Sequence, residues 1–149
     1  KILVAEVAST LNEDLLLQYM LGQTKERDTR LFLLGSRLDG LRQTLFRQVL
    51  FAEYELKIHE LAEQGEPLTG EKLSEVYLGL LKEYYGDAQG VCRVKDLYGV
   101  EWAYIQHFYL DFYVFQYATS IIGSSAIATE MRAESAAKKP VMKQQTLRV

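Results

Sequence analysis

Residues 27–63, RDTRLFLLGSRLDGLRQTLFRQVLFAEYELKIHELAE, decide the fold class of this 149-residue chain. The stretch contains no proline, and its apolar side chains recur at the spacing of an α-helix. The expected apolar face runs along Leu31, Leu34, Leu38, Leu41, Leu45, Gln48 and Phe51. A long helix with one face turned toward a core predicts an all-α protein, a bundle of helices.

The flanking segments predict further helices. Residues 2–21 repeat apolar side chains at helical spacing, and residues 69–86 form a second such pattern that Thr69 would cap. The last helix is predicted from roughly residue 102 or 106 to residue 132. The glycine-containing segment 86–100 lacks periodicity and is predicted to be a loop.

Composition indicates one globular unit. The hydrophobic fraction of 48% is enough for one core, and the net charge of −3 without a basic face argues against a nucleic-acid partner. The single cysteine, Cys92, excludes an internal disulfide and suits a reducing compartment, so we expect a cytoplasmic protein. No apolar run is long enough to cross a bilayer, and we expect no membrane partner.

Two carboxylates stand out in the first predicted helix. Glu6 and Glu13 are seven positions apart, which places them about 20° apart around a helix. They share with Leu17 a face that should turn inward, where an ionised carboxylate is destabilising by several kcal/mol unless it is paired or bound to metal. The sequence therefore predicts a nearby cation, which is either an arginine, with Arg42 and Arg47 as candidates, or a metal ion.

Aromatic and histidine side chains are concentrated in the last predicted helix. Tyr109, Tyr113 and Tyr117 follow one another at four-residue spacing and would line one helix face. Buried phenols need hydrogen-bond partners, so this stripe either packs in the core or lines a wet cleft. His107 would lie in the first turn, where an imidazole stays neutral and can donate a hydrogen bond to an oxyanion. A structural histidine is the alternative.

The sequence does not support other types of metal or catalytic site. A di-iron carboxylate bundle needs Glu-x-x-His, but Leu56 precedes His59 and Tyr104 precedes His107 at that spacing. Gly-x-Ser-x-Gly, phosphate-loop and Cys-x-x-Cys patterns are missing from the 149 residues.

The two ends of the chain differ from its centre. Lys1 begins the chain inside a helical pattern without a capping residue, so we expect a piece of a longer protein. Residues 135–149 carry four basic side chains and no acidic one. We predict a domain over residues 1–134 followed by a poorly ordered basic tail, with a weak anionic contact of the tail as the alternative.

Three separated blocks resemble a known family. They are AEVASTLNE (residues 5–13), LDGLRQTLFRQVLFAEYELKIHELAEQGEPLT (residues 38–69) and YIQHFYLDFYVFQYATS (residues 104–120). In order and spacing they are similar to the carboxy-terminal half of the catalytic domain of oligoendopeptidase F, a zinc metallopeptidase of the thimet oligopeptidase group. The resemblance covers roughly residues 4–128 and implies part of a larger, mostly helical zincin-type domain.

The resemblance also implies residue roles. Glu6 would be the third zinc ligand, and Glu13 would accept a hydrogen bond from a zinc-bound histidine. His107, Tyr109 and Tyr113 would face the zinc across the substrate cleft and donate hydrogen bonds to the substrate and the oxyanion, as catalytic residues.

One departure from the family decides the expected activity. The 149 residues contain no His-Glu-x-x-His, the motif that supplies two zinc ligands and the general base in this family. We therefore expect no peptide hydrolysis and only weak zinc binding by this chain alone, with the remainder of the parent polypeptide as partner, short peptides as substrates, and self-association of the fragment. The alternative is a non-catalytic helical interaction or scaffold module of the same ancestry.

Overall fold

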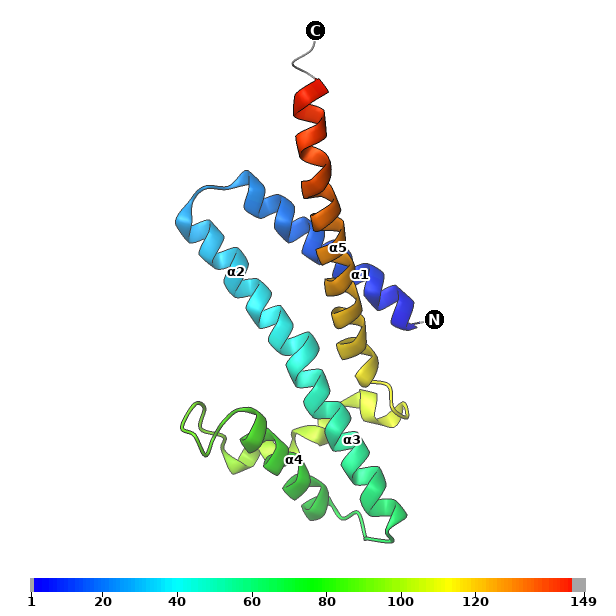
Figure 1. Ribbon diagram of the computed structural model, residues 1–149. Coiled ribbons are helices and arrows are strands. Elements are labelled where there is room, and N and C mark those ends of the chain that lie inside the picture. The colour runs from blue at the N-terminus through cyan, green and yellow to red at the C-terminus, as the bar shows by residue number, and fades with distance from the viewer. Residues whose placement is uncertain (1, 146–149) are drawn as a thin grey trace. The chain divides into compact units, whose positions relative to one another are not determined.

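The computed structural model describes the backbone of residues 2–145 and the side-chain surroundings of residues 4–135, and that part of the chain is built from helices and turns without a strand (Figure 1). In chain order the elements are α1 (Ile2–Gln23), α2 (Arg27–Leu41), a π-helical turn η1 (Arg42–Phe46), α3 (Arg47–Glu63), α4 (Gly70–Tyr84), the 3₁₀ segments η2 (Asp96–Tyr104) and η3 (Gln106–Tyr109), and α5 (Phe115–Gln145). The all-α prediction is confirmed.

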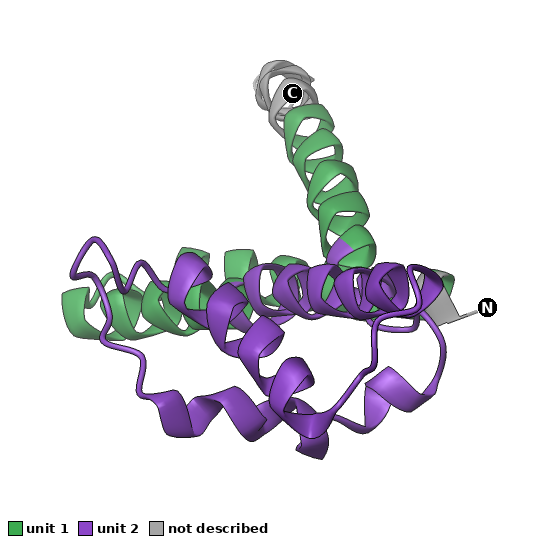
Figure 2. Cartoon of the chain, turned by 90° about the horizontal axis from the view of Figure 1, so that it is seen from below, with its two compact units in different colours: residues 1–41, 119–149 green, residues 42–118 purple. Residues whose placement is uncertain are grey.

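The chain divides into two compact units rather than the one expected from composition (Figure 2). Unit 1 consists of residues 1–41 and 119–149, and unit 2 consists of residues 42–118. Unit 1 therefore joins the two ends of the chain, whereas unit 2 is a continuous segment. The long helix predicted over residues 27–63 is present as α2, η1 and α3, and the boundary between the units falls at its π-helical turn.

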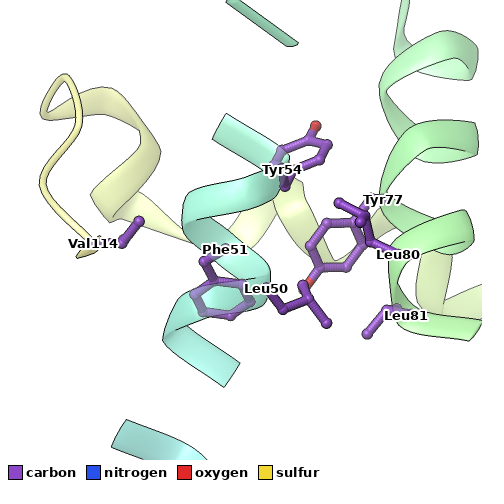
Figure 3. Packing of buried hydrophobic residues seen from close by; sticks show 7 residues of the cluster. All are labelled: Leu50, Phe51, Tyr54, Tyr77, Leu80, Leu81 and Val114. Atoms are coloured by element: carbon purple, nitrogen blue, oxygen red, sulfur yellow. The ribbon is translucent and has the colours of Figure 1, made fainter. Parts of the chain in front are cut away.

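An aromatic core holds unit 2 together (Figure 3). Its buried members are Leu50, Phe51, Tyr54, Tyr77, Leu80, Leu81 and Val114. The rings of Tyr54 and Tyr77 meet edge to face with centroids 5.1 Å apart, which adds to the hydrophobic gain from their burial. Helix α4 begins as predicted, because the Thr69 hydroxyl accepts a hydrogen bond from the Lys72 amide at 3.2 Å.

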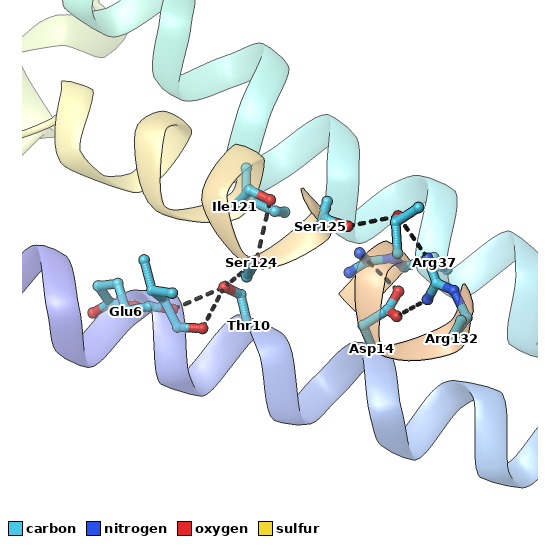
Figure 4. A network of polar contacts seen from close by, with 10 residues as sticks. Glu6, Thr10, Asp14, Arg37, Ile121, Ser124, Ser125 and Arg132 are labelled. Carbon is cyan, nitrogen blue, oxygen red and sulfur yellow. Dashed lines mark hydrogen bonds and ion pairs between the residues drawn. The ribbon is translucent and has the colours of Figure 1, made fainter. Parts of the chain in front are cut away.

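Unit 1 is held by polar contacts between α1, α2 and α5 (Figure 4). The Thr10 hydroxyl lies 2.7 Å from the Ser124 hydroxyl, and Asp14 pairs with Arg37 and Arg132. The two helices α1 and α5 also meet at Gly123, where an added Cβ would lie at an ordinary van der Waals distance of 3.8 Å from a Val7 methyl carbon. The buried face of α1 is therefore the polar stripe of Thr10 and Asp14.

The apolar face predicted for residues 27–63 is only partly buried. Phe51 lies in the core of unit 2, but Leu31, Leu34 and Leu38 are exposed. In the described part of α2 the buried residue is Leu33, which lies on a different side of the helix. The apolar periodicity of residues 27–63 therefore predicted a helix correctly. It was wrong about which side of α2, the first half of that helix, is buried.

The start predicted for the last helix is also wrong. Helix α5 begins at Phe115, and the preceding residues form two 3₁₀ segments and a turn. Trp102, Ile105 and Phe108 pack on the core of unit 2 at three-residue spacing, which matches the 3.0 residues per turn of a 3₁₀-helix. Asp111 and Phe112 then adopt positive φ, which an α-helix does not allow.

Helix α5 continues to Gln145, into the segment predicted as a basic tail. The side chains after residue 135 and the whole of residues 146–149 lie outside the described residues. Within the described residues, every helix is too short or too polar to span a membrane.

Candidate active site

The first candidate group lies on α1 in unit 1. Glu6 is half-buried, and its carbonyl oxygen lies 2.8 Å from the Thr10 hydroxyl (Figure 4). Glu13 is exposed and borders a hollow of about 230 Å³ together with Leu17 and Arg37. The expectation of an inward carboxylate is therefore wrong for Glu13, and Thr10 and Asp14 occupy the side of α1 that packs on α5.

The arginines considered as partners for Glu6 and Glu13 have other contacts. Arg47 pairs with Glu101, and its guanidinium carbon lies 4.8 Å from the centre of the Phe51 ring. Arg42 donates a hydrogen bond to the Tyr85 hydroxyl at 3.3 Å. Within residues 4–135, neither glutamate carboxylate forms an ion pair.

Asp14 is the buried carboxylate of α1 that sequence reasoning missed. Its two oxygens contact Arg37, at 3.4 Å, and Arg132. The argument that an inward carboxylate needs a cation was sound, but it applied to the residue after Glu13. Asp14 follows Thr10 by four residues, and this spacing of two polar side chains was the signal available in the sequence.

The carboxylate of Glu6 fits a metal ligand only as one member of a larger set. In the part of the chain that the structure describes, His, Cys, Asp and Glu side chains form no group of three able to hold a metal. Catalytic zinc requires three protein ligands, so the described residues alone do not make a complete site. Glu6 contributes an oxygen donor of the correct type, free of an ion pair within those residues.

The second candidate group is an aromatic cluster in unit 2 formed by His107, Tyr113 and Tyr117. The rings of His107 and Tyr113 are stacked, with centroids 5.4 Å apart and planes 15° apart. Tyr117 meets both rings edge to face, and its hydroxyl lies 3.5 Å from that of Tyr113. Neither ring nitrogen of His107 bonds to another described residue, so the imidazole keeps a donor for a ligand.

Tyr109 does not join this cluster. It lies at the end of η3, and 74% of its surface is exposed. Tyr109 and Tyr113 lie outside α-helix, so the predicted stripe of three tyrosines along one helix face is wrong. His107 lies in a short 3₁₀ segment rather than in the first turn of a long helix, so the helix-dipole argument for its neutral form does not apply.

A buried glutamate fixes the turn between His107 and Tyr113. Glu55 on α3 accepts a hydrogen bond from the Phe112 amide at 2.7 Å, and the ring of His59 lies 4.6 Å from that of Phe112. Burial raises the pKa of Glu55, and the hydrogen bond from the Phe112 amide, followed by the electrostatic effect of His59, partly opposes this rise. Sequence reasoning considered His59 only as a possible di-iron ligand and missed the contacts of Glu55 and His59 with the turn.

The segment 86–100 lines a pocket in unit 2 of about 300 Å³, at the lower limit for small-molecule sites. Arg47, Arg93 and Glu101 contribute charged groups to it, and Tyr85 and Tyr98 contribute rings. Glu101 is fixed there by Arg47 and by the Tyr77 hydroxyl, which donates to it at 2.9 Å. The pocket thus has a polar wall with fixed side chains.

Comparison with known proteins identifies the family. Residues 1–148 match Peptidase family M3. The chain belongs to this family. It is 47% identical over 133 residues to Oligopeptidase PepF of Bacillus subtilis (strain 168), which is 89% of this chain and 19% of that protein. It is 44% identical over 130 residues to the chromosomal Oligoendopeptidase F of Lactococcus lactis subsp. cremoris, covering 87% of this chain and 21% of that protein.

A solved M3 structure agrees with this assignment. The chain superposes on the crystal structure of oligoendopeptidase-F from Enterococcus faecium with a TM-score of 0.81 and 41% identity, over 89% of this chain and 26% of that one. The resemblance to oligoendopeptidase F is therefore confirmed. The chain spans about a fifth of the length of the curated M3 relatives that it matches.

Proposed function

We propose that the full-length protein containing this chain is a zinc metalloendopeptidase that hydrolyses short peptides in the cytoplasm. The observation that carries the proposal is the M3 match over residues 1–148 together with relatives named oligopeptidase and oligoendopeptidase. The 149 residues contain no His-Glu-x-x-His, so two zinc ligands and the general base come from another part of the full-length protein. This chain alone is inactive under the proposal.

Glu6 and Glu13 serve the metal in this proposal. Glu6 contributes a carboxylate oxygen as the third protein ligand, and its backbone is fixed because its carbonyl contacts Thr10, which also contacts Ser124 on α5. Glu13, exposed two turns further along α1, accepts a hydrogen bond from a ligand histidine and orients its ring. Bound zinc would supply a Lewis acid and an activated water.

His107 and Tyr113 bind the reacting peptide in this proposal. The imidazole and the phenol are stacked, half-buried and adjacent, so their polar atoms form one donor surface. Donors fixed in place before the reaction stabilise the oxyanion that forms when water attacks the scissile carbonyl. Tyr117 supports Tyr113 from the first turn of α5, whereas Tyr109 is exposed and contacts the substrate backbone.

Hydrolysis of an internally quenched peptide by the full-length protein tests the proposal. We expect cleavage that stops on addition of a chelator and returns with Zn²⁺. The 149-residue chain alone should show no cleavage under the same conditions. Full activity after chelator treatment and dialysis, or failure of the full-length protein to cleave any of a panel of short peptides, would contradict the proposal.

A further inference from the structure

The turn that separates His107 from Tyr113 is held by one carboxylate. Glu55 on α3 is 1% exposed, and its Oε1 atom accepts a hydrogen bond from the Phe112 amide at 2.7 Å. Its Oε2 atom is buried without a partner among the described residues. Placing a carboxylate there is unfavourable for folding, so a buried glutamate at this position calls for an explanation beyond core packing.

The backbone conformation of the turn is strained. Asp111 has φ 46° and Phe112 has φ 50°, and the left-handed region is unfavourable for each non-glycine residue that occupies it. Such a conformation persists only where its surroundings hold it. Glu55 binds the backbone of Phe112, and His59, one helical turn further along α3, contacts the Phe112 ring at 4.6 Å.

The turn determines where the next residues lie. Immediately after Phe112, Tyr113 stacks on His107, Val114 is fully buried in the core, and α5 begins at Phe115. A different conformation at positions 111 and 112 would move the phenol of Tyr113 away from the imidazole. Glu55 is linked to Tyr113 through the backbone, by its hydrogen bond to the Phe112 amide.

We infer that Glu55 is a positioning residue that holds the turn at Phe112 and thereby places Tyr113 against His107 for substrate binding. The inference rests on the proposed function, because it assumes that His107 and Tyr113 act on the substrate.

The electrostatic surroundings of the Glu55 carboxylate agree with a positioning role. Desolvation raises its pKa, the nearby Asp111 does so as well, and the Phe112 amide and His59 oppose both effects. The hydrogen bond from the Phe112 amide is therefore the main favourable contact of the buried Glu55 carboxylate.

Three variants of the full-length protein test the inference. Glu55→Gln keeps an oxygen acceptor for the Phe112 amide, and Glu55→Met removes it while preserving length and volume. Leu80→Ala opens a cavity in the same core, at a residue 2% exposed, and serves as the control for lost stability. Turnover and KM would be measured with an internally quenched peptide, together with hydrogen exchange of a peptide spanning Phe112.

We expect Glu55→Met to lose roughly tenfold to a hundredfold in kcat with little change in KM, since small misplacements of a catalytic group have effects of that size. Its Phe112 segment should exchange faster. Glu55→Gln should restore both properties to near the wild-type values, and Leu80→Ala should melt earlier with unchanged kcat. Leu80→Ala shows how much kcat falls from lost stability alone, so a loss of turnover in Glu55→Met that Leu80→Ala does not share would not reflect unfolding.

Unchanged kcat in Glu55→Met, or equal losses in Glu55→Met and Glu55→Gln, would overturn the inference. If Glu55→Met does not fold, rapid exchange of the Phe112 segment in the wild-type protein would also overturn it. The variant Tyr113→Phe distinguishes failure of the proposed function from failure of the inference about Glu55. Normal turnover in that variant removes the catalytic role of the cluster, whereas reduced turnover there with normal turnover in Glu55→Met removes only the role of Glu55.

Discussion

His107 and Tyr113 stack with ring centroids 5.4 Å apart, although a turn with two positive φ angles separates them. Their pairing therefore depends on tertiary contacts rather than on the spacing of residues along a helix. Two polar aromatic side chains held in this way can bind a substrate or stabilise the core, and the two roles predict opposite responses to mutation.

In the full-length protein, Tyr113→Phe or His107→Ala should lower kcat by roughly a hundredfold, because a lost oxyanion donor raises the barrier by about 3 kcal/mol. The melting temperature should change little. Both quantities would be measured on the same preparations. Tyr104→Phe, at a tyrosine that is 83% exposed, is the matched control and should leave both unchanged. Normal turnover with an earlier melting transition would assign the pair to the core.

Asp14 should be important for the stability of unit 1. Its carboxylate contacts Arg37 and Arg132, and Arg132 is half-exposed, so water screens part of the interaction. We expect Asp14→Ala to lower the free energy of unfolding by about 1–3 kcal/mol, as measured by urea denaturation. Glu13→Ala, at the neighbouring exposed position, should change it by no more than about 0.5 kcal/mol. Equal effects of the two variants would contradict the structure of the network.

The hydrogen-bonded pair Tyr84 and Glu53 should make the folding stability depend on pH in the alkaline range. The Tyr84 hydroxyl donates to Glu53 at 2.6 Å, and burial, followed by this hydrogen bond, raises the pKa of Tyr84 to about 12. A raised pKa means that the fold favours the protonated phenol. Its contribution to stability is present below the unfolded pKa of about 10 and is lost as the pH rises toward 12.

The difference between the phenolate absorbance titrations of wild-type protein and Tyr84→Phe isolates this residue among the 10 tyrosines. We expect Tyr84 to remain mostly protonated at about pH 11, one unit below its raised pKa. A midpoint near the ordinary value for tyrosine would show that the hydrogen bond to Glu53 does not form.

The 149-residue chain should self-associate in solution. Leu31, Phe32 and Leu38 on α2 are 54%, 71% and 68% exposed, which is an unusual density of exposed large apolar side chains on one helix. Sedimentation velocity at increasing concentration should show larger species, and Leu31→Glu with Leu38→Lys should reduce them. A monodisperse monomer at high concentration would contradict this prediction.

The helices were predictable because periodicity is a local property. Residues 2–21 lie in α1, residues 27–63 lie in α2, η1 and α3, and the predicted helix at 69–86 is present as α4 (Gly70–Tyr84), which Thr69 caps as its position suggests. The direction in which a helix faces was less predictable, because it depends on which segment packs against it. Thr10 and Asp14 are buried on α1 only because Ser124 and Arg132, far away in the sequence, supply their partners.

The aromatic segment before α5 was the hardest part to predict. Tyr109, Tyr113 and Tyr117 have helical spacing, but Trp102, Ile105 and Phe108 have the three-residue spacing that prevails in the structure. The left-handed turn at Asp111 and Phe112 contains no glycine, which is the usual sequence signal for positive φ, and Glu55 on α3 stabilises it. The roles of Glu6, Glu13, His107, Tyr109 and Tyr113 remain predictions that rest on the M3 family resemblance.

The zinc content of full-length Glu6→Gln after dialysis, measured by atomic emission, tests the central claim most directly. The wild-type protein should retain one zinc ion per molecule, and Glu6→Gln should lose it, because an amide is a poor replacement for a carboxylate ligand. Glu13→Gln is the matched control on the same helix. It should bind zinc more weakly by roughly tenfold to a hundredfold in a chelator competition while still containing zinc. Stoichiometric zinc in Glu6→Gln would contradict the assignment of Glu6 as a metal ligand.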